Sequence, residues 1–251
     1  MIKFVQFYNL QLTELPYLKE ELGATKTPPV LTDKSGEIIS IELNDLSVET
    51  LQPLSKFKSL QKLTLPFFSK TNFSLEFVAE LVNLKELTIS YNEITDIEPI
   101  KFCKKLEALY LNDNKIENLK PLSNLNSLHT LFVNSNKISD LQPLSLLNHL
   151  TLFVANNNMV ENIKAIENLT DLESIDLSNN SIEDINPLRY LEKLTDLNLS
   201  NNRIVNIDVI KYLQNLDDLR LHDNFIEDIE GLANLTKLRN LGMTGNKIKN
   251  I

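Results

Sequence analysis

The residue types that most often carry chemistry are sparse in this chain and poorly placed for catalysis. His222 lies near Asp218 and Arg220, but no nucleophile accompanies it at a spacing typical of a hydrolase triad. His129 and His149 fall at unrelated positions and are interpreted as surface residues. We therefore expect no intrinsic enzyme activity from the histidines.

Metal and cofactor chemistry is equally poorly represented. Asp176, Asp196 and Asp218 could in principle contact Ca²⁺, yet calcium takes about six to eight oxygen ligands and no loop is built to supply them. The single cysteine, Cys103, excludes an internal disulfide framework and any cysteine-cluster metal site. The 5 glycines form no phosphate-binding loop. We expect no metal and no cofactor.

Composition limits the class of partner. The chain has 251 residues, 25 Lys plus Arg and 34 Asp plus Glu, which gives a net charge of −9 and argues against nucleic-acid binding. No apolar run reaches the ~18 residues that a membrane span needs. The N-terminal residues lack the apolar core of a signal peptide, which favours a cytoplasmic location. Secretion without a recognisable signal is the alternative.

The abundant residue is asparagine, and its spacing is regular. Each asparagine of the series follows an apolar frame of the form Leu106-x-x-Leu109-x-Leu111. The frame recurs every 22 residues, except for a step of 24 between Leu60 and Leu84. Regular self-similarity of this length is typical of a stacked repeat protein. The series is Asn92, Asn114, Asn136, Asn158, Asn180, Asn202, Asn224 and Asn246.

The repeat predicts its own geometry. Period-2 alternation predicts a short strand with one buried face, and a 22-residue unit returns one strand spacing away, so the strands run parallel. The asparagine amide can donate and accept where the chain leaves the strand, so we expect a structural asparagine ladder. The rest of each unit predicts a turn and a short or 3₁₀ helix. Prolines in one register mark the bend: Pro53, Pro99, Pro121, Pro143 and Pro187.

These motifs identify a resemblance. The frame, the 22-residue length and the phrases Ile185-Asn186-Pro187-Leu188 and Ile97-Glu98-Pro99-Ile100 resemble leucine-rich repeat proteins. The resemblance is to the internalin-type bacterial subclass and to the phosphatase-regulatory subclass. It implies an α/β right-handed solenoid with parallel β-strands on the concave face and short or 3₁₀ helices and turns on the convex face.

The two ends depart from the frame. Residues 1–37 are predicted to be an N-terminal cap or flanking segment, with helical spacing over residues 10–22. Residues 38–251 are predicted to be a solenoid of about ten 22–24-residue repeats, the last one incomplete. No polar cap follows the final apolar positions. We expect either a longer natural chain or end-to-end self-association through this uncapped end.

The candidate partner-binding residues lie between the core positions, on the concave face. A mid-stack apolar and aromatic patch is followed by acidic residues, which suits an apolar or basic protein partner. Ordinary strand propensity and a solvated acidic face are the alternative interpretations. An acidic ridge that includes Asp96, Asp140, Glu161, Glu183, Asp184, Glu227 and Asp228 is interpreted as a solubilising face. The predicted contacts are Tyr91, Tyr110, Phe132, Leu152, Val154, Asp176, Asp196, Asp218, Arg220 and His222.

The sequence therefore predicts a non-catalytic scaffold that binds a protein partner on its concave face. The alternative is the recognition arm of a larger multidomain enzyme or bacterial effector. Phe225 stands out on the edge after the strands, where other repeats place Lys115, Lys137 or Arg203, and is a second candidate contact.

Overall fold

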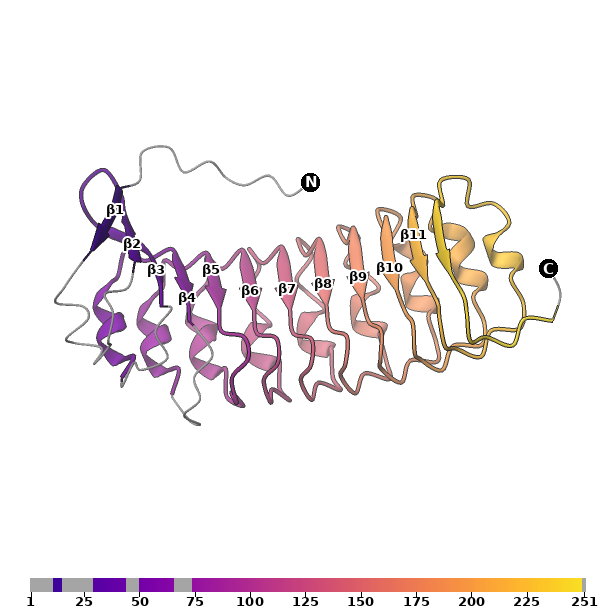
Figure 1. Cartoon of the computed structure of the whole chain (residues 1–251), viewed down its shortest axis with the longest axis horizontal. Coiled ribbons are helices and arrows are strands. Elements are labelled where there is room, and N and C mark those ends of the chain that lie inside the picture. The colour runs from indigo at the N-terminus through magenta and orange to yellow at the C-terminus, as the bar shows by residue number, and fades with distance from the viewer. Residues whose placement is uncertain (1–10, 15–28, 44–49, 66–73, 250–251) are drawn as a thin grey trace.

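The computed structural model describes residues 11–14, 29–43, 50–65 and 74–249. The described part is an elongated stack in which one strand follows the next in chain order (Figure 1). The strands are β1 (Gln11–Glu14), β2 (Pro29–Thr32), β3 (Ile38–Glu42), β4 (Lys62–Thr64), β5 (Glu86–Thr88), β6 (Ala108–Tyr110), β7 (Thr130–Phe132), β8 (Leu152–Val154), β9 (Ser174–Asp176), β10 (Asp196–Asn198), β11 (Asp218–Arg220) and β12 (Asn240–Gly242).

The strands from β3 to β12 pair in parallel, as the repeat spacing predicts. The middle residue of each strand from β4 to β11 points inward and is buried, while its two neighbours stay partly or fully exposed. The 24-residue step keeps this register, with Lys62 opposite Glu86. The predicted solenoid is confirmed.

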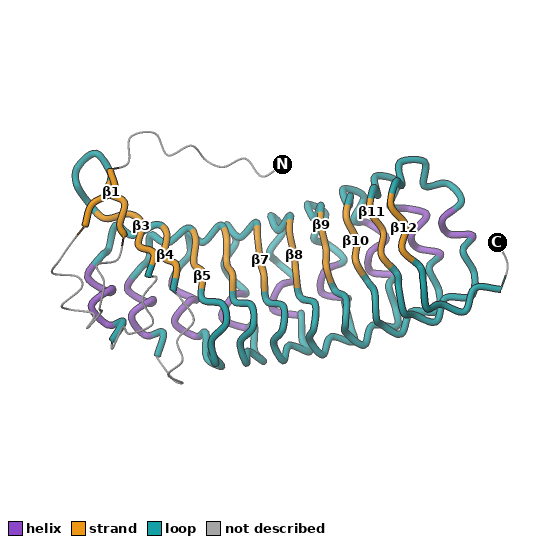
Figure 2. Tube along the Cα trace, viewed as in Figure 1, coloured by secondary structure: helices purple, strands orange, loops and turns teal. Residues whose placement is uncertain are grey.

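The other half of each rung contains a 3₁₀ helix, and these short helices run along the side opposite the strands (Figure 2). Proline occupies one of the first two positions in five of them, where its fixed φ suits a helix start. The predicted bend is confirmed. The described helices are η1 (Gln52–Lys56), η2 (Glu76–Glu80), η3 (Glu98–Phe102), η4 (Lys120–Leu122), η5 (Gln142–Leu144), η6 (Lys164–Ile166), η7 (Asn186–Tyr190), η8 (Asp208–Tyr212) and η9 (Glu230–Leu232).

Part of the predicted acidic ridge has a structural task. The Oδ1 atom of Asp140 accepts a hydrogen bond of 2.8 Å from the backbone N–H of Gln142 at the start of η5. The same Asx turn recurs in successive rungs and provides each helix start with an acceptor. The side chains in this position are Asp96, Asn118, Asp140, Asn162, Asp184, Asn206 and Asp228.

The asparagine series ties each rung to the one before it. Nδ2 of Asn136 donates to the carbonyl oxygens of Leu111 at 2.9 Å and Val133 at 3.0 Å. Its Oδ1 accepts from the backbone N–H of Ile116 at 2.9 Å. Because the side chain is buried, these bonds satisfy backbone groups that water cannot reach. The same pattern repeats at Asn114, Asn158, Asn180, Asn202, Asn224 and Asn246.

The N-terminal end differs from the rest of the sheet. β1 pairs antiparallel with β2, and β2 pairs antiparallel with β3, so this hairpin occupies the outer edge of β3. The helical spacing predicted over residues 10–22 is wrong at Gln11–Glu14, which form a strand because sheet pairing overrides local spacing. The remainder of that prediction lies outside the described residues, and the role of residues 1–37 as a cap stays a prediction.

Along the part of the chain that the structure describes, no helix has the length and apolar character that a membrane crossing requires.

Candidate functional site

An apolar patch lies in the middle of the strand face, which is the exposed side of the sheet. Tyr110, Phe132 and Val154 end β6, β7 and β8 and stand opposite one another in the strand register. Their side chains are partly exposed because residues on either side of a buried strand position point away from the core. The rings of Tyr110 and Phe132 are tilted by 38° with centroids 5.2 Å apart. Leu152 lies on the same face at the start of β8 and is also partly exposed.

Tyr91 occupies a different kind of position from the other aromatic residues. It follows β5 in the turn, has a φ of 61° and is 62% exposed. Its side chain has no ring contact with Tyr110, so the structure leaves it outside the stacked pair. The equivalent residues in later rungs also have positive φ but are short and polar: Asp113, Ser135, Asn157, Asn179, Asn201 and Asp223.

An ion pair borders the patch on its N-terminal side. Nζ of Lys62 lies 2.7 Å from Oε1 of Glu86, and both side chains belong to the strand face. Partial burial raises the pKa of the Tyr110 hydroxyl, and the nearby Glu86 carboxylate raises it further. The Tyr110 hydroxyl therefore stays neutral well above neutral pH, and the patch is bounded by a balanced pair of charges.

The predicted acidic residues occupy two separate columns. Asp176 stands opposite Val154 and Asn198, whereas Asp196 stands opposite Asp218 in the neighbouring column. Oδ1 of Asp176 accepts 2.9 Å and 2.7 Å hydrogen bonds from the backbone N–H and hydroxyl of Ser178. The three carboxylates do not converge, and no group of histidine, cysteine and acidic side chains within the described ranges could hold a metal ion.

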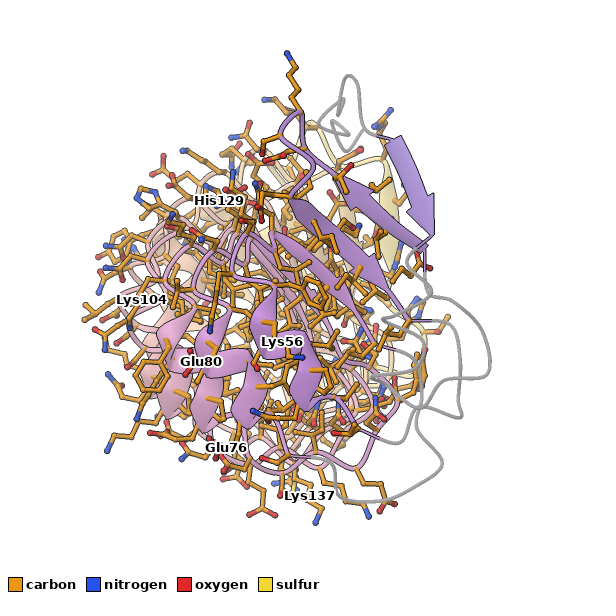
Figure 3. The ribbon with its side chains drawn as sticks, turned by 90° about the vertical axis from the view of Figure 1, so that its left-hand side faces the viewer. Lys56, Glu76, Glu80, Lys104, His129 and Lys137 are labelled. Carbon is orange, nitrogen blue, oxygen red and sulfur yellow. The ribbon has the colours of Figure 1, made fainter. Side chains whose placement is uncertain are left out.

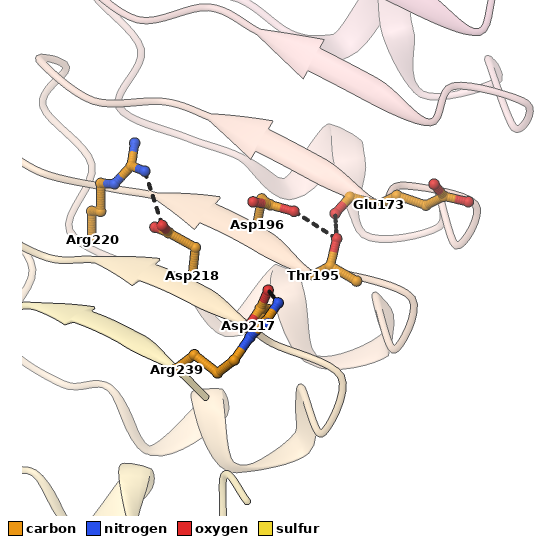
Figure 4. Close-up of polar contacts among 7 residues, drawn as sticks. All are labelled: Glu173, Thr195, Asp196, Asp217, Asp218, Arg220 and Arg239. Carbon is orange, nitrogen blue, oxygen red and sulfur yellow. Dashed lines mark hydrogen bonds and ion pairs between the residues drawn. The ribbon is translucent and has the colours of Figure 1, made fainter. Parts of the chain in front are cut away.

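Asp218 and Asp196 differ in how much of their charge is free. Oδ2 of Asp218 lies 2.9 Å from a guanidinium nitrogen of Arg220, so its charge is paired (Figure 4). Asp196 is exposed and accepts a 2.7 Å hydrogen bond from the hydroxyl of Thr195. A neutral donor leaves the negative charge uncompensated, so Asp196 and Asp176 present more free charge than Asp218 does.

His222 faces the next rung and not the acidic residues. Its Nδ1 lies 2.6 Å from Oγ1 of Thr244 and 3.2 Å from the backbone nitrogen of the same residue. The ring also lies over Gly242, where an added Cβ would come within 2.1 Å of Nε2. Gly242 is therefore needed for this packing, and His222 serves as a contact between the last two described strands.

The other candidate chemical groups lie away from the strand face. His129 and His149 stack with ring centroids 6.1 Å apart on the opposite flank of the strands, where Figure 3 labels His129. Cys103 is fully buried, and burial raises the pKa of its thiol to about 12. Its Sγ lies 3.4 Å from the carbonyl oxygen of Val78, so it is a core residue. These positions agree with the interpretation made from the repeat register.

A second set of residues, which the sequence interpretation missed, joins rungs along the flank that precedes the strands. Asp217 forms an ion pair with Arg239, and the hydroxyl of Thr195 donates to the carbonyl oxygen of Glu173 at 3.1 Å (Figure 4). The Arg239 hydrogen bond lowers the pKa of Asp217. The signal was present in the sequence as opposite charges 22 residues apart. The other pairs at this spacing are Lys58–Glu80, Lys85–Glu107, Glu93–Lys115, Asp171–Lys193 and Glu227–Lys249.

Comparison with known proteins gives consistent matches for this arrangement. A family model described as "Leucine Rich repeats (2 copies)" matches residues 82–124, 104–146, 147–190, 170–212, 192–234 and 214–251. A search of curated proteins finds no match.

Solved structures give the same picture. An internalin C2 from Listeria monocytogenes is 33% identical with a TM-score of 0.70, over 79% of this chain and 86% of that chain. A leucine-rich repeat protein from Leptospira interrogans is 28% identical with a TM-score of 0.75, over 82% and 54%. An internalin F from Listeria monocytogenes is 26% identical with a TM-score of 0.57, over 91% and 80%. The predicted internalin-type resemblance is confirmed.

Proposed function

Because this chain belongs to the leucine-rich repeat family, we propose that it is a non-catalytic scaffold whose strand face binds a protein partner. The fold alone hosts many binding roles, so the proposal depends on particular side chains. The face is preformed by the stacked strands, and a rigid surface loses little conformational entropy on binding.

The observation that carries the proposal is the patch of Tyr110, Phe132, Leu152 and Val154. These side chains are partly exposed on consecutive strands, and two of the rings already contact each other. A solvent-facing sheet has no packing need for apolar side chains in consecutive rungs. Contiguous exposed apolar surface of this kind marks interaction sites, and aromatic side chains are frequent energetic anchors there.

The charges beside the patch favour a partner with basic groups next to its apolar anchor. Asp176 and Asp196 follow the patch on its C-terminal side, and neither forms an ion pair. Asp218 contributes less because Arg220 neutralises it. Charge complementarity of this kind increases the association rate and the specificity more than the affinity. Tyr91, Arg220 and His222 are proposed as contacts at the two ends of the same surface.

The test is affinity capture with the Phe132→Asp variant beside wild-type protein, read out by mass spectrometry. A charge in the middle of the patch should abolish capture of the partner. Leu146→Asp is the matched control, because Leu146 is an apolar side chain that is 68% exposed outside the strand face. Circular dichroism should show the same folded signal for all three proteins. Equal capture by wild type and Phe132→Asp would remove the strand face as the binding surface.

Self-association is a second candidate, supported by one observation. Leu241 in β12 is 49% exposed, whereas Leu219 at the same position of β11 is fully buried. We infer that a second copy can cover this exposed rung end to end. Sedimentation should then show a concentration-dependent dimer that Leu241→Asp removes. A monomer at all concentrations would exclude the idea.

The remaining predictions concern context. The strand face would serve equally well in the recognition arm of a larger enzyme or effector, and the cytoplasmic location stays a prediction. Subcellular fractionation of the source cells, with an antibody against the chain, would separate that location from secretion without a recognisable signal.

A further inference from the structure

The edge where the chain leaves the strands changes its character along the stack. This edge is formed by the residues that follow each ladder asparagine, and Figure 3 labels one of them, Lys137, at the bottom of the view. At the N-terminal end its charges are paired, Glu93 with Lys115 at 2.9 Å and Glu117 with Lys137 at 3.6 Å. Beyond Phe225 it is paired again through Glu227 and Lys249.

The intervening stretch exposes apolar side chains. Met159, Val205 and Phe225 are 52%, 57% and 43% exposed, at positions where other rungs carry lysine or glutamate. The ring of Phe225 has Nζ of Lys247 at 4.6 Å from its centroid. Neither the core nor the asparagine ladder requires apolar residues here, because the equivalent charged residues fold into the same rung.

Two adjoining clefts run along this stretch. One has a volume of about 490 Å³ and ends on Val205 and Phe225. The other has a volume of about 400 Å³ and extends to Glu161. They share Glu183, Asp184 and Arg203, so they form one groove across several rungs, which we call the edge groove.

The charges of the edge groove are not neutralised within the chain. Glu161, Glu183 and Arg203 form no ion pair among the described residues. For Glu161 the reason is visible in the sequence, because Ser181 stands where Lys137 stands relative to Glu117. These acidic groups are accessible to a ligand.

We propose that the edge groove is a second binding site, distinct from the strand face, for an extended peptide segment that carries a basic side chain beside an aromatic or aliphatic one. The basic group would pair with Glu161 and Glu183, and the apolar group would pack against Val205 and Phe225. The guanidinium of Arg203 would donate to backbone carbonyl oxygens of the peptide. This arrangement gives a partner to each unpaired charge and covers the exposed apolar side chains.

The probe is a random peptide library displayed on phage, panned on the full chain. Each round is first cleared on the Phe225→Glu variant, so that only peptides that need the groove remain. Enriched sequences should place lysine or arginine beside an aromatic or aliphatic residue. Their synthetic forms should bind wild type at least tenfold more tightly than Phe225→Glu or Glu183→Lys, and binding should weaken as salt increases.

Matched controls separate this site from other surfaces. Glu117→Lys changes the same kind of residue on the same edge outside the groove, and Phe132→Asp alters the strand face, so both should keep the affinity for these peptides. Glu183→Gln, which hardly changes the shape of an exposed side chain, keeps the test valid if Phe225→Glu fails to fold. The proposal is overturned if no sequence is enriched, if the enriched peptides are acidic, or if Glu183→Gln leaves their affinity unchanged.

Discussion

Tyr91 has a conformation that its own rung does not need. A left-handed backbone costs a non-glycine residue roughly 1–2 kcal/mol, and asparagine tolerates it better than tyrosine. The later rungs solve the problem with short polar residues such as Asn157 and Asn179. An aromatic side chain that is strained and 62% exposed contributes little to stability, and its retention fits a role in contact with a partner.

Replacing Tyr91 with asparagine should therefore stabilise the protein. We expect the free energy of unfolding to rise by about 1 kcal/mol, because the turn is relieved of an unfavourable φ. Urea denaturation followed by circular dichroism measures the change. Asn157→Tyr is the reciprocal control and should lower the free energy by a similar amount. A lower urea midpoint for Tyr91→Asn would contradict this account of the turn.

The flanks of the strands hold their neighbours by charge as well as by backbone pairing. Asp217 and Arg239, 22 residues apart, join adjacent rungs just before β11 and β12. The pKa of Asp217 is lowered by the Arg239 hydrogen bond, so the folded state favours the ionised carboxylate. This stabilisation is present above the carboxyl's ordinary pKa and is lost as the pH falls through the lowered value.

Asp217→Asn tests this sign. At neutral pH the variant should unfold at a slightly lower urea concentration than wild type, because the ion pair is gone. The difference should shrink as the pH falls through the acid range and vanish once Asp217 is protonated in both states. High salt at neutral pH should also reduce it, since the pair is exposed. A gap that persists in acid would assign the effect to packing and not to charge.

The elements themselves were largely predictable, and the reason is the repeat. The period-2 frame placed each strand from Lys62 onward, and the prolines placed the 3₁₀ helices. The strand at Gln11–Glu14 was missed because its partner lies outside the repeat. The Asx turns at positions such as Asp140 were interpreted as solubilising surface, since the sequence does not show which side chain reaches a backbone N–H two residues on.

The candidate site was predictable in composition more than in detail. Alternation alone put Tyr110, Phe132 and Val154 on one face. It did not show that Arg220 would neutralise Asp218 or that His222 would turn toward Thr244, because these contacts depend on side-chain orientation. The edge groove depends on ion pairs that are absent, and a sequence pattern does not show which charges remain unpaired.

The whole stack behaves as a chain of neighbours. Strands and 3₁₀ helices contact their counterparts in adjacent rungs, so cooperativity is passed along the asparagine ladder from one rung to the next. Damage in the middle of the ladder separates two long segments, whereas damage at its end releases only one rung.

Asn136→Ala should therefore be much more harmful than Asn246→Ala. The first removes a buried amide that bonds both to its own rung and to the preceding one, and we expect a loss of about 3 kcal/mol. The unfolding transition should also broaden as the two segments decouple. Asn246 is less buried, so its loss should cost about half as much and keep the transition sharp. Identical transitions for both variants would show that the ladder carries no cooperativity.

A stack without contact between its first and last rungs also has a mechanical character. Tension applied at the two ends would reach the terminal rungs first and peel them away in turn. Each 22-residue rung would release roughly 75 Å of extended chain. The protein would thus act as an extensible tether that lengthens in even steps, while the central rungs stay intact under load.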